Sequence, residues 1–346
     1  MSVVLVGFGN VGQSFASLLL QKQTFLRERF DVELLIVGAA DSGIEKNFHS
    51  AYSANGLNSV TLLDLKKNHS TVAAYPGAGC TDSAIELIEN SNSDLLLETT
   101  PTNLENGEPG LSHVRAALKA GMHVVTSNKG PLVFGWKELR ELARSQGKEF
   151  RFGASVAGAL PIIPMGHYSL MGSEVSSIQG ILNGTTNYIL SQMERKGITM
   201  KDALSEAQRM GIAEANPKLD LEGYDTAFKL LIAANAIMDA DAKLSDIEIR
   251  GIEKISAEQV GSARERGNAY KLIGRADRIN GRLEMRVGVE EVDGNHPFRW
   301  VNGTWKSVLF KTDLLGEVLV TGGASSPKLT AGAMLRDVLN IMNEIS

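Results

Sequence analysis

The sequence predicts an α/β protein whose amino-terminal half is a doubly wound, mostly parallel sheet. Three observations support this fold class. The chain opens with a short apolar strand, a glycine-rich turn and a helical pattern over residues 3–20. Further strand-like runs, at residues 94–100, 123–128 and 150–156, are separated by helical stretches. After residue 161 this alternation gives way to a different order of elements, which indicates a second domain.

Length and composition exclude several classes of protein. The 346 residues suit two domains, and 43% hydrophobic against 22% charged residues allow a sizeable core. A formal net charge of −5 gives no basic excess, so we expect no nucleic-acid binding. The longest apolar run, residues 230–238, is shorter than the ~18 residues of a membrane span, and no apolar leader precedes the first strand. We expect a soluble, cytoplasmic protein that binds no membrane.

The glycines of the first turn have the spacing of a dinucleotide-binding site. Gly7 permits a tight turn after the strand, Gly9 lets a pyrophosphate approach the backbone, and Gly12 allows close packing of helix against strand. The first N–H groups of the helix, together with its dipole, would hold the anion. The sequence therefore predicts a Rossmann-type domain for NAD or NADP. The cofactor-binding residues expected in this turn are Gly7, Gly9, Asn10, Val11 and Gly12.

The second strand, residues 34–41, ends in Asp41. A carboxylate at this point accepts hydrogen bonds from a ribose hydroxyl and repels a 2′-phosphate, so we expect NAD to be preferred over NADP. No lysine or arginine follows until Lys46. Asp41 lies 29 residues beyond Gly12, where about 20 is usual, although a longer first helix would absorb the difference. A solvated acid at the strand end is the alternative interpretation.

Polar clusters follow two later strands, at residues 99–103 and 126–130. Ligands of doubly wound sheets bind at the carboxyl ends of the strands. Thr100 is therefore a candidate cofactor contact, and Lys129 is a candidate cation beside the nicotinamide. Ordinary turn chemistry is the alternative for both clusters.

The segment over residues 207–229 is dense in acids and glycine and leads into an apolar helix. Asp225 and Lys229 lie four residues apart on that helix, and in isolation they would form an exposed ion pair worth ~0.3–0.5 kcal/mol. The whole segment, however, resembles the signature of homoserine dehydrogenases. Glu214 stands where that family has its substrate-binding glutamate. The positions that fit the signature are Ala207, Gly211, Ile212, Ala213, Asn216, Pro217, Asp220, Leu221, Gly223, Asp225 and Lys229.

Other blocks of this chain agree with the family in order, so the resemblance covers nearly the whole chain. It implies the single-function form of the enzyme, without an aspartokinase or regulatory domain. The implied reaction is the NAD(P)-dependent interconversion of L-homoserine and L-aspartate 4-semialdehyde, in threonine and methionine biosynthesis. The supporting blocks are the glycine turn, the Thr100 loop, and residues 127–129, 156–163 and 181–187.

The resemblance also implies a three-part architecture. Residues 1–150 would form the dinucleotide-binding domain, and residues 151–305 an α+β domain for substrate binding, catalysis and dimerisation. Residues 306–346 would return to the nucleotide domain, with Gly322 in a glycine-rich loop at the cofactor. Members of the family are typically homodimers joined through the sheet of the substrate domain.

Reduction of an aldehyde by hydride needs a group that stabilises the developing alkoxide and delivers a proton. A lysine ammonium suits both tasks. We expect Lys229 to be the acid/base, Lys129 the second catalytic cation near the nicotinamide, and Asp225 the residue that orients Lys229 or the substrate hydroxyl. Glu214 and Asp220 would bind the substrate ammonium.

Two regions of the sequence depart from the family pattern. Gly153 stands where many members have a glutamate that joins backbone oxygens around a monovalent cation. The carbonyls of Val156 and Gly158 would then be the remaining ligands, so we expect no strong metal site. Ser325 and Ser326 replace the usual glycine or alanine of the last glycine-rich loop.

Three other functions remain open from the sequence. An aspartate-semialdehyde dehydrogenase would need a thiolate, and Cys80 is the single cysteine of the chain. We interpret Cys80 as a buried structural residue, since it lies far in sequence from residues 207–229. A non-catalytic dinucleotide-sensing protein would have no reason to keep the acids and lysine of that segment together. Another NAD(P)-dependent amino-acid oxidoreductase on the same scaffold would differ in the substrate loop.

Overall fold

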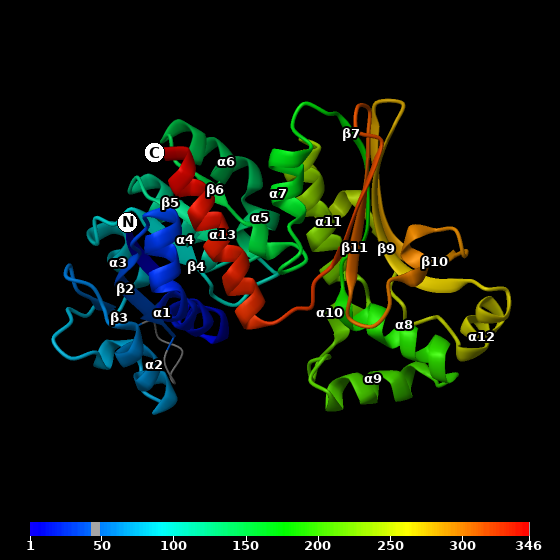
Figure 1. The fold of residues 1–346 in the computed structure, drawn as a ribbon, viewed down its shortest axis with the longest axis horizontal. Coiled ribbons are helices and arrows are strands. Elements are labelled where there is room, and N and C mark those ends of the chain that lie inside the picture. Colours follow the sequence, from blue (N-terminus) through cyan, green and yellow to red (C-terminus); the bar gives the residue numbers. More distant parts are fainter. Residues whose placement is uncertain (43–48, 346) are drawn as a thin grey trace. The chain divides into compact units, whose positions relative to one another are not determined.

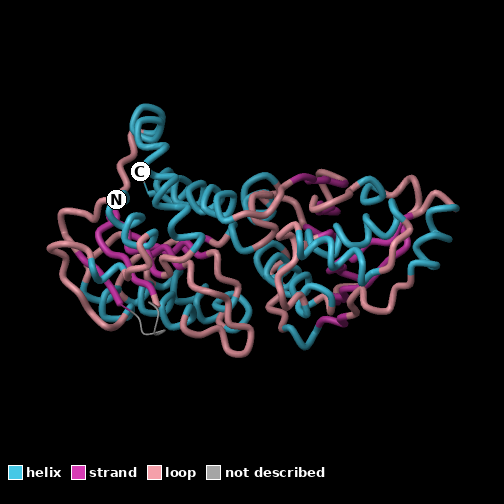
Figure 2. Tube along the Cα trace, turned by 90° about the horizontal axis from the view of Figure 1, so that it is seen from below, coloured by secondary structure: helices cyan, strands magenta, loops and turns pink. Residues whose placement is uncertain are grey.

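The computed structural model describes residues 1–42 and 49–345. The chain forms two compact units: Met1–Ser155 together with Ser326–Ser346, and Val156–Ser325. Each unit contains a six-stranded sheet (Figure 1). Both termini belong to the first unit, and Figure 2 shows the helices that flank the strands in each unit. Among the described residues, no helix combines the length and hydropathy that a membrane crossing requires.

The sheet of the first unit is doubly wound, which confirms the predicted α/β fold class. Its strand order is β3-β2-β1-β4-β5-β6, and only β3 is antiparallel to its neighbour. The chain moves outward from β1 in both directions, so the ligand-binding switch point lies between β1 and β4. The strands are β1 (Ser2–Val6), β2 (Leu35–Asp41), β3 (His49–Tyr52), β4 (Leu95–Glu98), β5 (His123–Thr126) and β6 (Phe150–Arg151).

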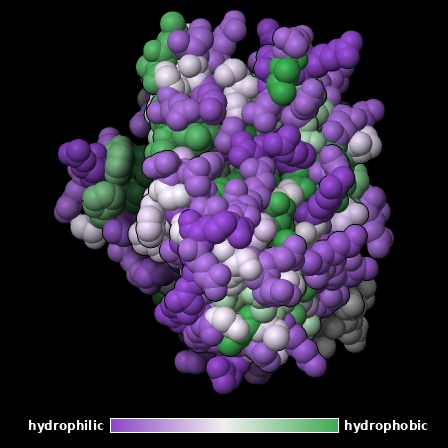
Figure 3. Space-filling view, turned by 90° about the vertical axis from the view of Figure 1, so that its right-hand side faces the viewer, coloured by the Kyte–Doolittle hydropathy of each residue, from purple (hydrophilic) through white to green (hydrophobic). Residues whose placement is uncertain are grey.

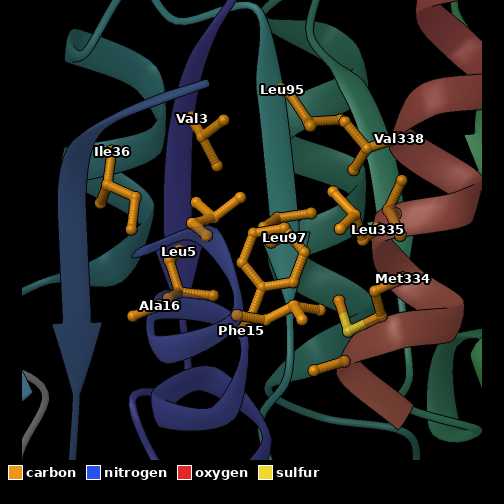
Figure 4. Packing of buried hydrophobic residues seen from close by; sticks show 14 of the residues in the cluster. Val3, Leu5, Phe15, Ala16, Ile36, Leu95, Leu97, Met334, Leu335 and Val338 are labelled. Atoms are coloured by element: carbon orange, nitrogen blue, oxygen red, sulfur yellow. The ribbon is translucent and has the colours of Figure 1, made fainter. Parts of the chain in front are cut away.

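Helices cover both faces of this sheet. Val3 and Leu5 of β1 pack with Phe15 of α1 and Met334 of α13 on one face (Figure 4). Val4 and Val6 of β1 pack on the other face with α3, α4 and α6. Burial on both faces explains why β1 is a continuous apolar run. The helices are α1 (Asn10–Phe30), α2 (Ser59–Lys67), α3 (Ala84–Asn90), α4 (Gly110–Lys119), α5 (Gly130–Phe134), α6 (Trp136–Ser145) and α13 (Pro327–Ile345), with short turns η1 (Val72–Ala74) and η2 (Gly153–Ser155).

The second unit is built on a mainly antiparallel sheet of order β12-β11-β7-β9-β10-β8. The helix α11 packs on one face of it, with Thr226 and Leu230 against Gly274. The strands are β7 (Val175–Ile181), β8 (Ile247–Ile249), β9 (Ala269–Ile279), β10 (Arg282–Val292), β11 (Lys306–Thr312) and β12 (Glu317–Gly322). The helices are α7 (Ile162–Pro164), η3 (Met165–Ser169), α8 (Gly184–Lys196), α9 (Met200–Arg209), α10 (Lys218–Leu221), α11 (Tyr224–Ile237), η4 (Leu244–Asp246), α12 (Ala257–Glu265) and η5 (Pro297–Trp300).

The opposite face of the second sheet carries polar pairs. Gly274 faces α11, and because successive strand residues point to opposite faces, Arg275 points away from that helix. Its guanidinium donates two hydrogen bonds of 2.6 Å to the Glu290 carboxylate. Lys311 pairs with Glu317 at 2.9 Å on the same face, and Leu319 is 45% exposed there. Figure 3 shows the side that carries β10 and α12, where hydrophilic side chains predominate and hydrophobic ones lie between them.

The carboxy-terminal segment differs from the expectation. Residues 306–325 were expected to return to the nucleotide domain, but they belong to the second unit and form β11 and β12. The reason is strand pairing: β11 satisfies its backbone on both sides, against β7 and β12. The chain returns to the first unit only at Ser326, from which α13 follows.

Candidate functional site

The glycine turn after β1 is shaped by close backbone approaches. Gly7 has φ 98°, and a Cβ there would lie 2.5 Å from the carbonyl carbon of Thr99. A Cβ on Gly12 would lie 2.5 Å from the carbonyl oxygen of Gly7. Gly9, in contrast, has no atom within 4 Å of its Cβ position. Two glycines therefore allow the turn to pack tightly, and the third leaves open space beside the start of α1.

The first turn of α1 offers unused backbone donors to that space. The helix begins at Asn10, and the capping residue Gly9 supplies no side-chain acceptor. The first N–H groups of a helix have no intrahelical partner. No acidic side chain lies in this turn to compete with an anion. The N–H groups of Asn10, Val11 and Gly12 are thus suited to a pyrophosphate.

Asp41 lies at the end of β2, but it has a cationic partner that the sequence analysis missed. Its side chain is 6% exposed, and Oδ2 lies 2.5 Å from the Nζ of Lys66 on α2. Its other oxygen, Oδ1, is buried and has no hydrogen-bond partner in the described part of the chain. Lys46, the nearest cation in sequence, lies outside the described residues. The negative charge expected to repel a 2′-phosphate is therefore partly offset by Lys66.

A buried carboxylate organises the loops that follow β4 and β5. Glu98 is fully buried, and its Oε1 accepts hydrogen bonds from the N–H and the hydroxyl of Thr100. Its Oε2 accepts the Thr126 hydroxyl at 3.1 Å, and Asn128 Nδ2 donates to the Thr100 hydroxyl at 3.1 Å. The Thr100 side chain thus serves the network itself. Glu98 was missed by the sequence analysis, although an acid that ends the apolar run at residues 95–97 was a usable signal.

Lys129 follows this network at the start of α5. Its N–H donates to Thr102 Oγ1 at 3.3 Å, and the next N–H, of Gly130, donates to Asn128 Oδ1 at 2.9 Å. The side chain is partly buried. The glycine turn, the Thr100 loop and Lys129 therefore follow β1, β4 and β5, which are adjacent strands of one parallel sheet. The predicted cofactor-binding residues of these three loops therefore lie together at the carboxyl ends of the strands.

In the second unit, Lys229 and Asp225 form a largely buried pair on α11. The two side chains are 13% and 16% exposed, and the ammonium donates to Asp225 Oδ2. The same Nζ donates to the carbonyl of Leu182, just after β7, at 3.0 Å. This geometry differs from the exposed ion pair that the spacing alone would suggest. It fixes the lysine between a carboxylate and a backbone carbonyl.

Asn183 joins this pair to a second carboxylate. Its Nδ2 donates to Asp220 Oδ1 at 2.6 Å and to Asp225 Oδ2 at 2.8 Å. Its Oδ1 accepts the N–H of Thr186 at 2.9 Å and so caps α8. One amide therefore holds α8, α10 and α11 together around the two acids. Asn183 lies in the block 181–187 that supports the family resemblance, but its role between the two acids was not predicted from the sequence.

Burial, and then the charge of Asp225, raises the pKa of Asp220. Hydrogen bonds from Asn183 and Thr185 and the charge of Lys229 oppose that shift without cancelling it. A partly buried acid whose pKa is raised is stabilised in its charged form by an added positive charge. Asp220 is thus suited to receive a ligand ammonium.

Glu214 lies on the exposed loop after α9. The hydroxyl of Thr185 donates to the carbonyl of Ile212 at 3.1 Å, and Gln208 Nε2 donates to the carbonyl of Glu214 at 3.2 Å. The loop is therefore tethered to the start of α8 and to α9. No partner engages the Glu214 carboxylate in the described ranges, which leaves it open to a ligand cation.

A second lysine near this cluster was also missed. Lys306, the first residue of β11, is 1% exposed. Burial, and then the charge of Lys229, lowers its pKa to about 8, while Asp225 opposes the shift. Its Nζ donates to Ser325 Oγ. Gly322, expected at the cofactor, ends β12 in this unit with φ 144°.

The monovalent-cation site that the family resemblance suggests does not fit these residues. A Cβ at Gly153 would lie 2.8 Å from Asp337 Oδ1 and 2.9 Å from Arg336 Nη2, so the space for a glutamate side chain is filled. The Gly153 N–H donates to Asp337 Oδ2 at 2.7 Å. In the second unit, the Lys306 ammonium lies 3.5 Å from the carbonyl oxygen of Ala157, the residue between Val156 and Gly158. Across residues 1–42 and 49–345, no cluster of three acidic, histidine or cysteine side chains suits a metal.

Cys80 is exposed, so its interpretation as a buried cysteine is wrong. It lies in the first unit, on the loop just after Gly79, which forms an isolated β-bridge with Tyr52. Its Sγ donates to the carbonyl of Ala73 at 3.3 Å. Short glycine-rich loops of this kind bury few side chains, which accounts for the exposure.

Two family profiles match this chain, one mainly over each of its two units. The profile of the family described as homoserine dehydrogenase matches residues 161–339. The profile described as the NAD-binding domain of homoserine dehydrogenase matches residues 7–153. The two matches together span most of the chain.

Similar proteins extend over the full length. A homoserine dehydrogenase of Methanocaldococcus jannaschii is 39% identical over 343 residues, with 99% of each chain covered. An NAD(+)-dependent homoserine dehydrogenase of Pseudomonas canavaninivorans is 35% identical, with 98% of this chain and 95% of the other covered. A crystal structure of homoserine dehydrogenase from Thermoplasma acidophilum has a TM-score of 0.82 at 27% identity, with 99% of each chain covered.

Proposed function

The chain belongs to the homoserine dehydrogenase family, and from this premise we propose how its residues carry the reaction. It is an NAD(P)-dependent oxidoreductase that acts on a CH–OH group. Its reaction interconverts L-homoserine and L-aspartate 4-semialdehyde, in the biosynthesis of threonine and methionine. The observation that carries the residue assignments is the hydrogen-bonded cluster of Lys229, Asp225, Asn183 and Asp220.

Lys229 is the acid/base of the proposed mechanism. When bound, the nicotinamide supplies hydride to the aldehyde or accepts it from the alcohol. The Lys229 ammonium donates a proton to the oxygen on which negative charge develops, and in the reverse direction the neutral amine removes the hydroxyl proton. Asp225 and the carbonyl of Leu182 support the ammonium from two sides. Their fixed positions favour a single lysine geometry for the transfer.

The acids of the second unit bind the substrate ammonium in this proposal. Asp220 offers a partly buried carboxylate whose pKa is raised, and Glu214 offers a carboxylate that no described residue engages. Asn183 fixes Asp220 relative to Asp225, and so relative to the lysine. Lys129 is assigned to the nicotinamide end, because it follows β5 at the edge of the dinucleotide-binding sheet.

The cofactor is assigned to the glycine turn and to the end of β2. Gly7, Gly9 and Gly12 admit the pyrophosphate at the start of α1. The unpartnered Oδ1 of Asp41 supports a hydrogen bond to a ribose hydroxyl. NAD remains the preferred cofactor in this proposal, although Lys66 reduces the expected margin over NADP.

Two further proposals concern the setting of the enzyme. The exposed face of the second sheet, with its charge pairs and the exposed Leu319, suits a second copy of the chain, so we assign a homodimer. As a biosynthetic enzyme with no basic excess, it is assigned to the cytoplasm, with no nucleic acid or membrane as a partner.

The direct test is the initial rate of nicotinamide reduction with L-homoserine and either NAD or NADP. L-Serine, L-threonine and L-malate serve as competing alcohols: serine has a shorter chain, threonine has its hydroxyl on a different carbon, and malate lacks the ammonium. The proposal expects turnover of homoserine, with kcat/KM at least roughly tenfold above that for the other alcohols. Faster turnover of another alcohol would identify a different amino-acid oxidoreductase on this scaffold. Cofactor binding without turnover of any alcohol would identify a sensing protein.

A further inference from the structure

Lys306 carries a buried positive charge that the proposed mechanism does not use. It is 1% exposed at the start of β11. Its ammonium donates to Ser325 Oγ and faces the carbonyl oxygens of Ala157 and Gly323, each at 3.5 Å. No carboxylate in the described part of the chain forms a direct ion pair with it. The charge is therefore balanced locally by oxygen dipoles, as a bound metal cation often is.

The oxygen atoms around this ammonium come from two loops of the second unit that lie against each other. A Cβ on Gly158 would lie 3.6 Å from Ser325 Oγ, and a Cβ on Gly323 would lie 3.4 Å from the backbone nitrogen of Leu160. Ala157 has φ 57°, a left-handed conformation that alanine rarely adopts. Such a conformation persists where the surroundings hold it in place. The ammonium provides such a hold, because its three N–H donors match the three surrounding acceptors.

The same ammonium lies close to the proposed acid/base. Ser307 pairs with Ile181 in the antiparallel β11–β7 pair. Lys306, which precedes Ser307, and Leu182, which follows Ile181, therefore lie at the same end of that pair. The carbonyl of Leu182 accepts the hydrogen bond from Lys229. The charges of Lys229 and Asp225 both act on Lys306. The loops that Lys306 joins are thus connected to the backbone that positions Lys229.

We propose that the Lys306 ammonium is a built-in cation that replaces a bound monovalent metal ion and positions the Lys229–Asp225 pair. It neutralises the inward carbonyls of the two loops and fixes the backbone next to the pair. This inference rests on the proposed role of Lys229, and it makes Lys306 a positioning residue. Ser325, which departs from the family pattern, supplies the third acceptor.

The test compares the response of the wild type and Lys306→Ala to small cations at constant ionic strength. Choline is the background cation, and sodium, potassium or ammonium replaces it in steps. We expect wild-type kcat and melting temperature to be unaffected by the exchange. We expect Lys306→Ala to lose roughly 10- to 100-fold in kcat, with a smaller change in KM. Potassium or ammonium should then restore part of its kcat saturably and raise its melting temperature.

The matched control is Lys201→Met, which removes an exposed lysine from α9 of the same unit, away from the site and from the face assigned to the dimer. It should keep wild-type kcat and show no response to the cations. If Lys306→Ala does not fold, Lys306→Met keeps the side-chain length without the charge, and it should fold with a kcat at least roughly tenfold below wild type.

Several results would overturn this inference. They are wild-type turnover that requires sodium or potassium, wild-type kcat in Lys306→Met, and a folded Lys306→Ala whose activity and melting temperature no cation restores. Failure of the wild type to oxidise homoserine in every salt would instead contradict the proposed function. The melting temperatures need no substrate, so they test the cation role separately.

Discussion

Each unit of this protein contains a mostly buried acid–lysine pair, and the two pairs differ in what surrounds them. Asp41 and Lys66 join β2 to α2 in the first unit, with side chains 6% and 22% exposed. Asp225 and Lys229 lie on one helix of the second unit, with side chains 16% and 13% exposed. Asp225 also accepts from Asn183, and Lys229 also donates to Leu182. Asp41 Oδ1, in contrast, is buried without a partner within the described ranges.

The difference indicates two kinds of task. A lysine held by several fixed groups keeps one geometry, which suits a proton transfer that depends on precise placement. A carboxylate with one unused oxygen retains hydrogen-bonding capacity for a ligand. We therefore expect perturbation of the Asp225–Lys229 pair to change catalysis, and perturbation of the Asp41–Lys66 pair to change the choice of cofactor.

The largest expected effect is that of Lys229→Met. Removal of a general acid or base typically costs 10²–10⁴-fold in rate, so kcat should fall by roughly that factor. Binding of the dinucleotide, measured by calorimetry, should stay within about twofold of wild type, because the glycine turn belongs to the other unit. A variant that retains a tenth of wild-type kcat with an unchanged pH profile would contradict the assignment.

The second-largest effect concerns Glu214, one of the two acids that we assign to the substrate ammonium. Glu214→Gln keeps the shape of the side chain and removes the charge that we assign to the substrate ammonium. A charged hydrogen bond contributes about 1.5–3 kcal/mol, so KM for homoserine should rise by roughly 10- to 150-fold. Glu222→Gln, an acid of the neighbouring α10–α11 segment, is the matched control. Unchanged KM and kcat in Glu214→Gln would identify Glu214 as a solvated loop acid.

A third effect follows from the raised pKa of Asp220, which burial and the charge of Asp225 cause. Below that pKa the acid is protonated and no longer attracts the substrate ammonium. Homoserine affinity should therefore weaken as pH falls. The loss should begin at a higher pH than the protonation of an ordinary aspartate would cause. Asp220→Asn should raise KM at neutral pH and flatten its acidic dependence. A KM profile that is the same in wild type and Asp220→Asn would exclude this role.

The same comparison explains which parts of the site were predictable from sequence. Asp225 and Lys229 are four residues apart on a helix, so their proximity follows from helix geometry. The glycine turn was predictable because its spacing sets the local backbone. Lys66, Glu98 and Asn183 were missed, because their partners are brought to them by the packing of separate elements.

The domain boundary shows the same limit. The apolar residues of 308–310 and 318–320 are typical of strands, but such a pattern does not say which sheet a strand joins. Pairing with β7 places them in the second unit. Lys306 looked like an ordinary strand lysine for this reason, and only the loops around it reveal its three acceptors.

The smallest effect, on the choice of cofactor, tests the other pair. The wild type should have the higher kcat/KM with NAD, because Asp41 Oδ1 can accept a ribose hydroxyl. In Lys66→Met the carboxylate loses its compensating cation, so the preference for NAD over NADP should increase by roughly fivefold, or about 1 kcal/mol. In Asp41→Asn the repulsion of a 2′-phosphate disappears while Lys66 remains, so the preference should decrease by a similar factor.

The double variant Asp41→Asn with Lys66→Met separates charge from structure. If the two side chains act through their charges, the double variant should return towards the wild-type ratio, because each change cancels the other. Melting temperatures control for the loss of a buried ion pair, which would lower stability without altering the ratio of the two cofactors. A tenfold wild-type preference for NADP would contradict the assignment of Asp41 to the ribose. An unchanged ratio in both single variants would leave the pair a purely structural link between β2 and α2.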